Sequence, residues 1–274
     1  MSRFQGKTVV ITGASSGIGE ACARKFVEEG ANVVLAARSK EPLDKLAAEL
    51  GSSVAHAVPA DISDVGACKK LLQEAVSRFG RIDVLVNNAA HNFRGAFERL
   101  PMEDILQILH VNLRAPMVLT RLALPTMRSQ GAGSVVNVAS LAGRFPLDDE
   151  ATYSATKFAL RIFSFAVAEE LRETGIRISV VSPGPVDTGF ITDPSVIESV
   201  PPLVFSQPMS TAEEIADLVL DSAADGARER TKPAFSGKLA TLGYLMPALR
   251  RVLLPAMERK GAREKKKYIA RQRG

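Results

Sequence analysis

Residues 7–30 read KTVVITGASSGIGEACARKFVEEG, in which a β-branched apolar run (8–12) is followed at once by a glycine-rich turn (13–19) and an amphipathic helical pattern to residue 29. Consecutive apolar residues indicate a strand covered on both faces, and the pattern after Gly17 indicates a helix. Glycines at such a turn let backbone N–H groups approach a phosphate at the positive end of the helix dipole. The stretch therefore predicts the first βα unit of a nucleotide-binding sheet.

The same alternation continues along the chain. Further strands are predicted at 32–37, 53–58, 83–87, 134–139 and 177–182, with helices at 41–49, 64–79, 103–129 and 153–173. Apolar strands joined by helical crossovers predict an α/β fold with a doubly wound parallel sheet in a single domain. We expect the dinucleotide-binding and catalytic domain to span 1–237 and a basic amphipathic extension to span 238–274.

The pattern is less regular after residue 182. Residues 183–210 hold six prolines and predict a long lid over the ligand-binding edge of the sheet. Thr211 and Glu214 form the signature of a capping box, so a helix is predicted to follow them. A last strand is predicted near 231–236.

The composition, 46% apolar and 24% charged residues, is close to the globular average and excludes disordered, collagenous and coiled-coil chains. Cys22 and Cys68 have no CxxC spacing and the three histidines are scattered, so neither a disulfide framework nor a metal site is predicted. The N-terminus lacks the pattern of a signal peptide, which favours a cytoplasmic location. The apolar run 239–249 is shorter than the ~20 residues that cross a bilayer.

The positive charge is concentrated at the C-terminus. Residues 249–274 hold ten basic and two acidic residues, a net charge of +8, whereas residues 1–248 carry −3. An amphipathic helical pattern, interrupted by Pro247 and Pro255, is formed by Leu239, Leu242, Met246, Leu249, Leu253 and Met257. Two interpretations remain: peripheral contact with an anionic membrane surface, or packing on the chain's own domain or a partner subunit with the charges solvated. No nucleic acid partner is expected, because only Tyr244 and Tyr268 are aromatic in this segment.

The end of the second predicted strand bears on cofactor choice. An acidic residue there binds the ribose 2′-hydroxyl of NAD, but this chain has Ala36, Ala37, Arg38 and Ser39. Arg38 can pair with a 2′-phosphate, and Ser15, Ser16 and Ser39 supply hydroxyls, so NADP(H) is predicted. The alternative is that Arg38 is an ordinary surface charge.

Tyr153 and Lys157 lie at positions i and i+4 of a predicted helix, hence on one face. A phenol titrates near pH 10, and an adjacent cation stabilises its phenolate. A tyrosine and a lysine at this spacing are also a common surface pair, so the wider context decides.

That context is a set of six motifs in a fixed order: TGASSGIG (12–19), NNAA (87–90), Asn112, Ser140, YSATK (153–157) and PGPVDT (183–188). From about residue 5 to 225 the chain resembles the short-chain dehydrogenase/reductase family. The resemblance implies a Rossmann-type fold, hydride transfer between a nicotinamide and a carbonyl or alcohol, and a homodimer or homotetramer formed through helices 103–129 and 153–173. Two departures are Ala90, where the family usually has glycine, and the lack of a glycine-rich last strand at 230–237.

The resemblance also implies residue roles. Tyr153 would be the general acid/base, Lys157 would lower its pKa and hold the nicotinamide ribose, Ser140 would hydrogen-bond the substrate oxygen, and Asn112 would anchor a water-linked proton relay. The cofactor-binding residues implied are Gly13, Ser15, Ser16, Gly17, Ile18, Gly19, Arg38, Ser39, Asp61, Ile62, Asn88, Ala89, Ala90, Tyr153, Lys157, Pro183, Gly184, Val186 and Thr188.

The predicted function is an NADP(H)-dependent oxidoreductase that interconverts a ketone or aldehyde and an alcohol. The apolar lid favours a lipophilic substrate. A further interpretation is a lipid enzyme that the basic extension recruits to a membrane. The alternative from another class is a nucleotide-binding regulatory or scaffold protein without turnover. The acidic run 148–150, just before Tyr153, is expected to be a solvated loop.

Overall fold

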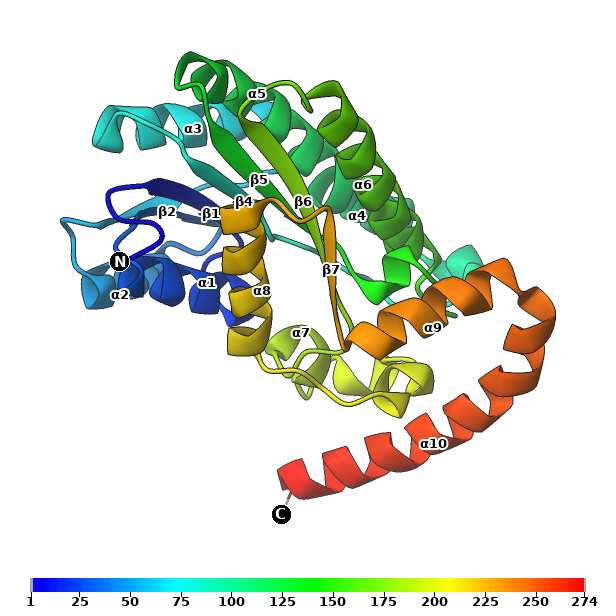
Figure 1. The fold of residues 1–274 in the computed structure, drawn as a ribbon. Helices are drawn as coiled ribbons and strands as arrows, with labels where there is room; N and C mark the ends of the chain where they lie inside the picture. The colour runs from blue at the N-terminus through cyan, green and yellow to red at the C-terminus, as the bar shows by residue number, and fades with distance from the viewer. Residues whose placement is uncertain (1, 274) are drawn as a thin grey trace.

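The computed structural model describes residues 2–273, although the side chains of Pro247, Leu249, Arg250, Gln272 and Arg273 lie outside the described part, and with them one predicted member of the amphipathic pattern, Leu249. A seven-stranded sheet in the order β3-β2-β1-β4-β5-β6-β7 forms the centre of the molecule (Figure 1). The strands are β1 (Thr8–Thr12), β2 (Asn32–Ala37), β3 (Ala55–Pro59), β4 (Val84–Asn87), β5 (Gly133–Val138), β6 (Ile176–Pro183) and β7 (Glu229–Lys232). Every neighbouring pair is parallel, which confirms the doubly wound sheet.

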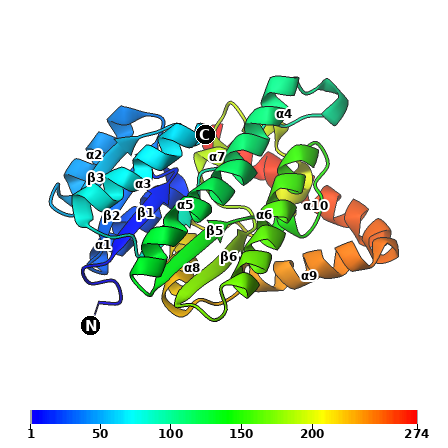
Figure 2. The same cartoon turned by 90° about the horizontal axis from the view of Figure 1, so that it is seen from above.

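Helices cover both faces of the sheet (Figure 2). The helices on one face are α1 (Gly17–Glu28), α2 (Lys40–Leu50) and α8 (Ala212–Asp225). Those on the other are α3 (Val65–Phe79), α5 (Ala115–Ser129) and α6 (Ala151–Glu170). Successive strand residues point to opposite faces, so Val9 and Ile11 pack under α1 while Val10 packs under α3.

Local signals fix the ends of several helices. The Asp64 side chain accepts a hydrogen bond from the Ala67 N–H at the start of α3, and Gly80 ends that helix in the left-handed region. The capping box predicted at Thr211 and Glu214 is present at the start of α8.

The helix predicted at 103–129 is three consecutive segments. They are α4 (Met102–Leu109), a π-helical turn η2 (His110–Arg114) and α5. A π turn widens the backbone hydrogen-bonding pattern by one residue and is frequent at functional sites. It places Asn112 in the interior of the protein.

The strand predicted at 231–236 is wrong in its position. β7 ends at Lys232, and helix α9 (Ala234–Leu245) begins directly after Pro233. Proline has no N–H to extend the ladder, and its fixed φ suits the entrance to a helix, so the apolar residues after it continue as a helix.

The extension returns across the molecule as a second helix, α10 (Pro247–Arg273), which contains Pro255 (Figure 1). It packs on the 3₁₀ segment η5 (Pro202–Ser206) of the lid, where a Cβ at Gly261 would lie 1.9 Å from the Pro202 carbonyl oxygen. Lys265 Nζ donates to the carbonyls of Glu198 and Val200, and the Tyr268 hydroxyl donates to Asp187 Oδ1 at 2.8 Å. The later part of the extension therefore packs on its own domain. Within residues 2–273 we find no helix with the length and apolar character needed to cross a bilayer.

Candidate active site

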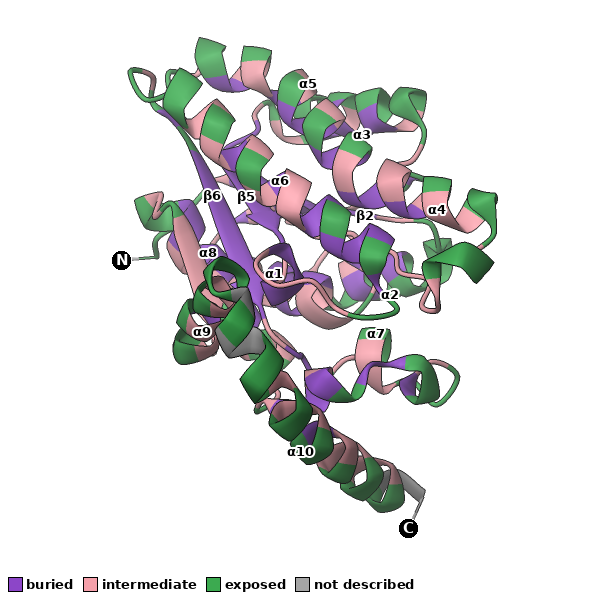
Figure 3. Cartoon of the chain, turned by 90° about the vertical axis from the view of Figure 1, so that its right-hand side faces the viewer, coloured by how far each residue is buried: buried purple, intermediate pink, exposed green. Residues whose placement is uncertain are grey.

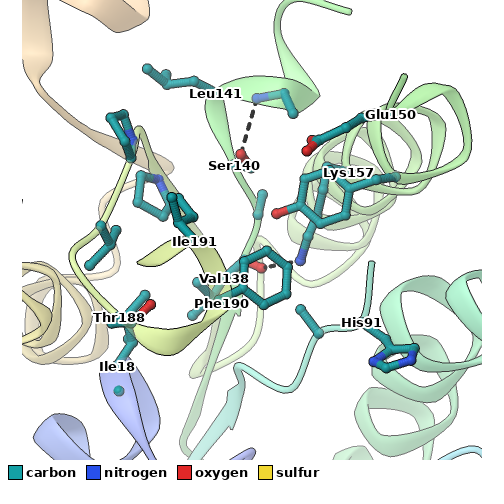
Figure 4. A pocket seen from close by; sticks show the side chains of 18 of the residues that line it. Ile18, His91, Val138, Ser140, Leu141, Glu150, Lys157, Thr188, Phe190 and Ile191 are labelled. Carbon is teal, nitrogen blue, oxygen red and sulfur yellow. Dashed lines mark hydrogen bonds between the residues drawn. The ribbon is translucent and has the colours of Figure 1, made fainter. Parts of the chain in front are cut away.

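A cavity of about 550 Å³ opens at the carboxyl ends of the strands, where the strand order reverses between β1 and β4. Ligands of doubly wound sheets bind at such a reversal. The glycine turn, the ends of β4, β5 and β6, the lid and the two C-terminal helices all contribute to its wall. Figure 4 shows that Ser140, Lys157 and the two lid residues Thr188 and Phe190 come from three segments and converge on this space.

The glycine turn is held against the end of β4 by close backbone contacts. Gly13 has φ +66°, and a Cβ there would lie 2.9 Å from the Ala89 Cα. A Cβ at Gly19 would lie 2.1 Å from the Gly13 carbonyl oxygen, so only glycine fits. The Asn88 amide donates to the carbonyls of Thr12 and Gly13, which fixes the turn to the neighbouring strand.

The structure places nearly all of the predicted cofactor-binding residues around one cavity. All of them line the cavity except Gly19, which lies behind the turn. Arg38 and Ser39 border it at the end of β2, with Arg38 exposed. Ala90 lines it as well, so its extra methyl group stands in the cavity wall.

Tyr153 lies in this wall with 8% of its surface exposed. Burial raises the pKa of its phenol, and the nearby Glu150 carboxylate raises it further, while a hydrogen bond with Ser140 and the charge of Arg94 act in the opposite direction. The phenol therefore keeps its proton at neutral pH and can donate it. The Ser140 hydroxyl also accepts a hydrogen bond from the Ala142 N–H at 3.1 Å, which orients it.

Lys157 is 2% exposed, and its ammonium donates to the Val138 carbonyl at 2.9 Å (Figure 4). Burial lowers the pKa of Lys157 to about 8. Its Nζ lies 5.6 Å from the centroid of the Tyr153 ring, so the two groups share one side of the cavity. The cation that lowers the pKa of Tyr153 here is Arg94, and acidification of the phenol by Lys157 stays a prediction.

Asn112 does not line the cavity. Its side chain accepts a hydrogen bond from the His91 N–H at 2.7 Å and donates to the His91 carbonyl at 2.8 Å. The π turn thus ties α4 and α5 to the loop that follows β4. Asn112 is joined through this loop to His91, which lines the cavity, and a water-linked relay through Asn112 stays a prediction.

Two residues that sequence reasoning missed lie beside Tyr153. Arg94 Nε is 2.7 Å from Glu150 Oε1, and the two side chains are 6% and 3% exposed. The expectation of a solvated acidic run is therefore wrong for Glu150, although Asp148 and Asp149 are exposed. A buried carboxylate requires a partner, and its partner is 56 positions away, so no local signal reveals the pair.

The far side of the cavity is apolar. It is lined by lid residues Phe190, Ile191 and Leu203 together with Leu239 and Ala240 of α9. Helix α10 adds Leu253, Leu254 and Met257. Sequence reasoning treated these helices as a tail and did not place them in the site; only the apolar periodicity hinted at burial.

The sequence model described as short chain dehydrogenase matches residues 7–195. The chain belongs to the short-chain dehydrogenase/reductase family. This assignment agrees with the resemblance drawn from the motifs, and members of the family are NAD(P)-dependent oxidoreductases.

Named relatives and a solved structure resemble this short-chain dehydrogenase/reductase over most of its length. A Nostoc protein named ketoacyl reductase HetN is 40% identical over 223 residues, which covers 80% of this chain and 77% of the relative. An uncharacterized oxidoreductase of Staphylococcus aureus is 35% identical over 188 residues, covering 69% of this chain and 81% of the relative. The crystal structure of a metagenomic short-chain oxidoreductase in complex with NADP superposes with a TM-score of 0.72 at 32% identity, covering 84% of this chain and 98% of that one.

Proposed function

We propose that the protein is an NADP(H)-dependent oxidoreductase that interconverts a lipophilic ketone or aldehyde and the corresponding alcohol. The observation that carries the proposal is that the Ser140 hydroxyl and the protonated, buried Tyr153 phenol stand in one cavity with a glycine turn shaped for a pyrophosphate. The turn fits a dinucleotide, since Gly13 and Gly17, both at positive φ, line the cavity without side chains and let the backbone approach a phosphate.

A bound nicotinamide would supply or accept the hydride at the carbonyl carbon. Tyr153 donates the proton that the carbonyl oxygen needs to become a hydroxyl, and it takes that proton back in the reverse direction. Ser140 places a second donor at the oxygen where negative charge develops. Lys157 supplies a buried cation on the same side of the cavity, where it would hold the ribose.

Preference for NADP(H) rests on the end of β2. No carboxylate stands at Ala37, and Arg38 borders the cavity where a ribose 2′-phosphate would lie. The NADP complex of the metagenomic neighbour supports the same choice.

A lipophilic substrate is supported by the apolar wall formed by the lid, α9 and α10. The name of the Nostoc relative makes a ketoacyl compound the first substrate to test. The division into a domain and an extension at residue 237 stays a prediction. Ser236 and Leu239 lie on either side of the division, and both line the cavity.

A homodimer or homotetramer and a cytoplasmic location complete the proposal. Exposed apolar side chains on the helices expected to pair, Leu106 on α4, Met117 on α5 and Ile162 on α6, support assembly through these helices.

The decisive test is Tyr153→Phe, with NADPH oxidation followed on a panel of ketones, aldehydes and acyl carbonyls. We expect turnover to fall by about 10²-fold or more while NADPH binding, measured by fluorescence titration, is retained. Undiminished turnover would mean that another group is the acid. Wild-type protein that binds NADPH yet turns over none of the panel would favour a nucleotide-binding protein without catalysis.

A further inference from the structure

Helix α9 is apolar on more than one side. Leu239, Ala240 and Gly243 line the cavity, whereas Phe235, Leu242 and Leu245, at helical spacing, do not line it and are exposed. Phe235 is 75% and Leu245 68% exposed. A helix that is hydrophobic all round is typical of a protein core or a membrane environment. The outward apolar side chains of α9 are therefore exposed, although a helix of this composition is usually covered.

Seven exposed apolar residues of α9 and the start of α10 are grouped here as the elbow patch: Phe235, Leu242, Tyr244, Leu245, Met246, Val252 and Leu253. Fifteen large apolar side chains are exposed in the described part of the chain, and these seven fall within nineteen residues. They extend from Phe235, near the start of α9, through the turn into α10; that turn lies away from the sheet in Figures 1 and 2, and Figure 3 shows this arm as largely exposed. Such a concentration marks an interaction surface.

Cations surround the elbow patch. Lys238 lies on the outer side of α9, and Arg251, Arg259 and Lys260 are exposed on α10. Apolar side chains ringed by lysine and arginine suit an anionic lipid surface, where the side chains enter the boundary of the acyl chains and the cations meet the headgroups. A second copy of the chain suits it less, because a twofold contact would bring Lys238 and Arg251 against their own counterparts.

The elbow patch is continuous with the wall of the cavity. Leu253 is 38% exposed and also lines the cavity, beside Leu254 and Met257. Molecules that lie in a bilayer under the patch would meet an apolar path to Tyr153. We propose that the elbow patch docks on an anionic lipid bilayer and admits lipophilic substrates from it; the second clause rests on the proposed function.

Flotation of the full chain with vesicles tests the docking. Vesicles of equal parts phosphatidylglycerol and phosphatidylcholine are compared with pure phosphatidylcholine, at about 0.1 M and about 1 M salt, where the Debye length falls from about 10 Å to about 3 Å. We expect the protein to float with the anionic vesicles at low salt and to be released by high salt or by neutral lipid. Leu242→Gln with Leu245→Gln should weaken binding at least about tenfold.

The matched control is Phe97→Gln with Met102→Gln, which removes two exposed apolar side chains outside the extension and should leave binding unchanged. Wild-type protein that stays with the soluble fraction, or a patch variant that floats like the wild type, overturns the proposal. So does a patch variant that dissociates an oligomer in light scattering while vesicle binding persists, which would make the patch an interface between copies.

Turnover of a water-soluble carbonyl with NADPH, measured on the same preparations, separates this proposal from the proposed function. Binding without turnover refutes only the function, and turnover without binding refutes only the docking. Neither Leu242 nor Leu245 lines the cavity, so the patch variant should keep wild-type turnover of the soluble carbonyl.

Discussion

Arg94 Nε lies 2.7 Å from Glu150 Oε1 in the interior of the protein. Glu150 stands at the start of α6, about one helical turn before Tyr153. The guanidinium also donates to the Phe190 carbonyl at 3.2 Å and lies 5.4 Å from the centroid of the Phe190 ring. A single side chain from the loop after β4 therefore holds both the start of α6 and the lid. The two charges act on the pKa of Tyr153 in opposite directions: Glu150 raises it and Arg94 lowers it.

Replacing Glu150 by glutamine removes the negative charge that raises the pKa of Tyr153. We expect the pH at which carbonyl reduction begins to fall to be lower in Glu150→Gln than in the wild type, because the phenol then loses its proton more easily. The buried Arg94 loses its counterion, so stability should drop by about 3 kcal/mol. Rate profiles against pH and urea unfolding measure the two effects. Asp148→Asn, an exposed neighbour, is the control, and an identical pH profile in both variants would contradict the prediction.

Lys157→Met tests the burial of the ammonium. Below about pH 8 the folded wild type carries the Lys157 ammonium as a buried charge, and this burial lowers its stability. Between about pH 8 and the ordinary pKa of lysine, the unfolded chain binds more protons than the folded chain. Wild-type stability relative to the variant should therefore rise with pH, by about 2 kcal/mol between about pH 7 and about pH 9.5. Urea unfolding of both proteins at the two pH values measures the difference. A pH-independent gap would show that Lys157 titrates normally in the folded state.

Arg38→Asp should invert the cofactor preference. A carboxylate at the end of β2 repels a 2′-phosphate and accepts a hydrogen bond from the 2′-hydroxyl of NAD. Loss of a charge-assisted bond predicts roughly a ten- to hundredfold decrease in kcat/KM for NADPH relative to NADH. Steady-state kinetics with both cofactors provide the measurement, with Arg99→Asp, an exposed arginine outside the cavity, as the control. Unaltered selectivity would reject phosphate pairing by Arg38.

Gly261→Ala should separate α10 from the lid. The added methyl group would lie 1.9 Å from the Pro202 carbonyl oxygen, so the helix must move away from η5. Amides of 197–206 should exchange hydrogen faster, and KM should rise for long apolar carbonyls more than for short ones. Hydrogen exchange and kinetics on substrates of graded length check this, and Lys260→Ala on the exposed side of the same turn should behave like the wild type. Equal changes for long and short substrates would show that α10 does not form the substrate wall.

Most of the sheet was predictable because each buried parallel strand is a short apolar run and each crossover has helical periodicity. The glycine turn and YSATK were predictable because their chemistry depends on local spacing. Glu150 was not, since its burial depends on Arg94, which only the folded chain brings near. The start of α9 was mistaken for a strand because the alternation around Pro233 does not distinguish a last strand from a helix that proline initiates. The roles assigned to Asn112, Ser140, Tyr153 and Lys157 stay predictions until turnover is measured.

The return of α10 over η5 also bears on biosynthesis. During translation, the sheet and the glycine turn can form while the last helix is still inside the ribosome. The glycine turn of a nascent chain would then be in place before α10 completes the wall of the cavity. A product that stops before residue 247 would lack Leu253, Leu254 and Met257 and would leave that part of the cavity wall open to water. Premature termination would thus yield a protein that keeps the glycine turn but lacks part of the apolar wall of the cavity.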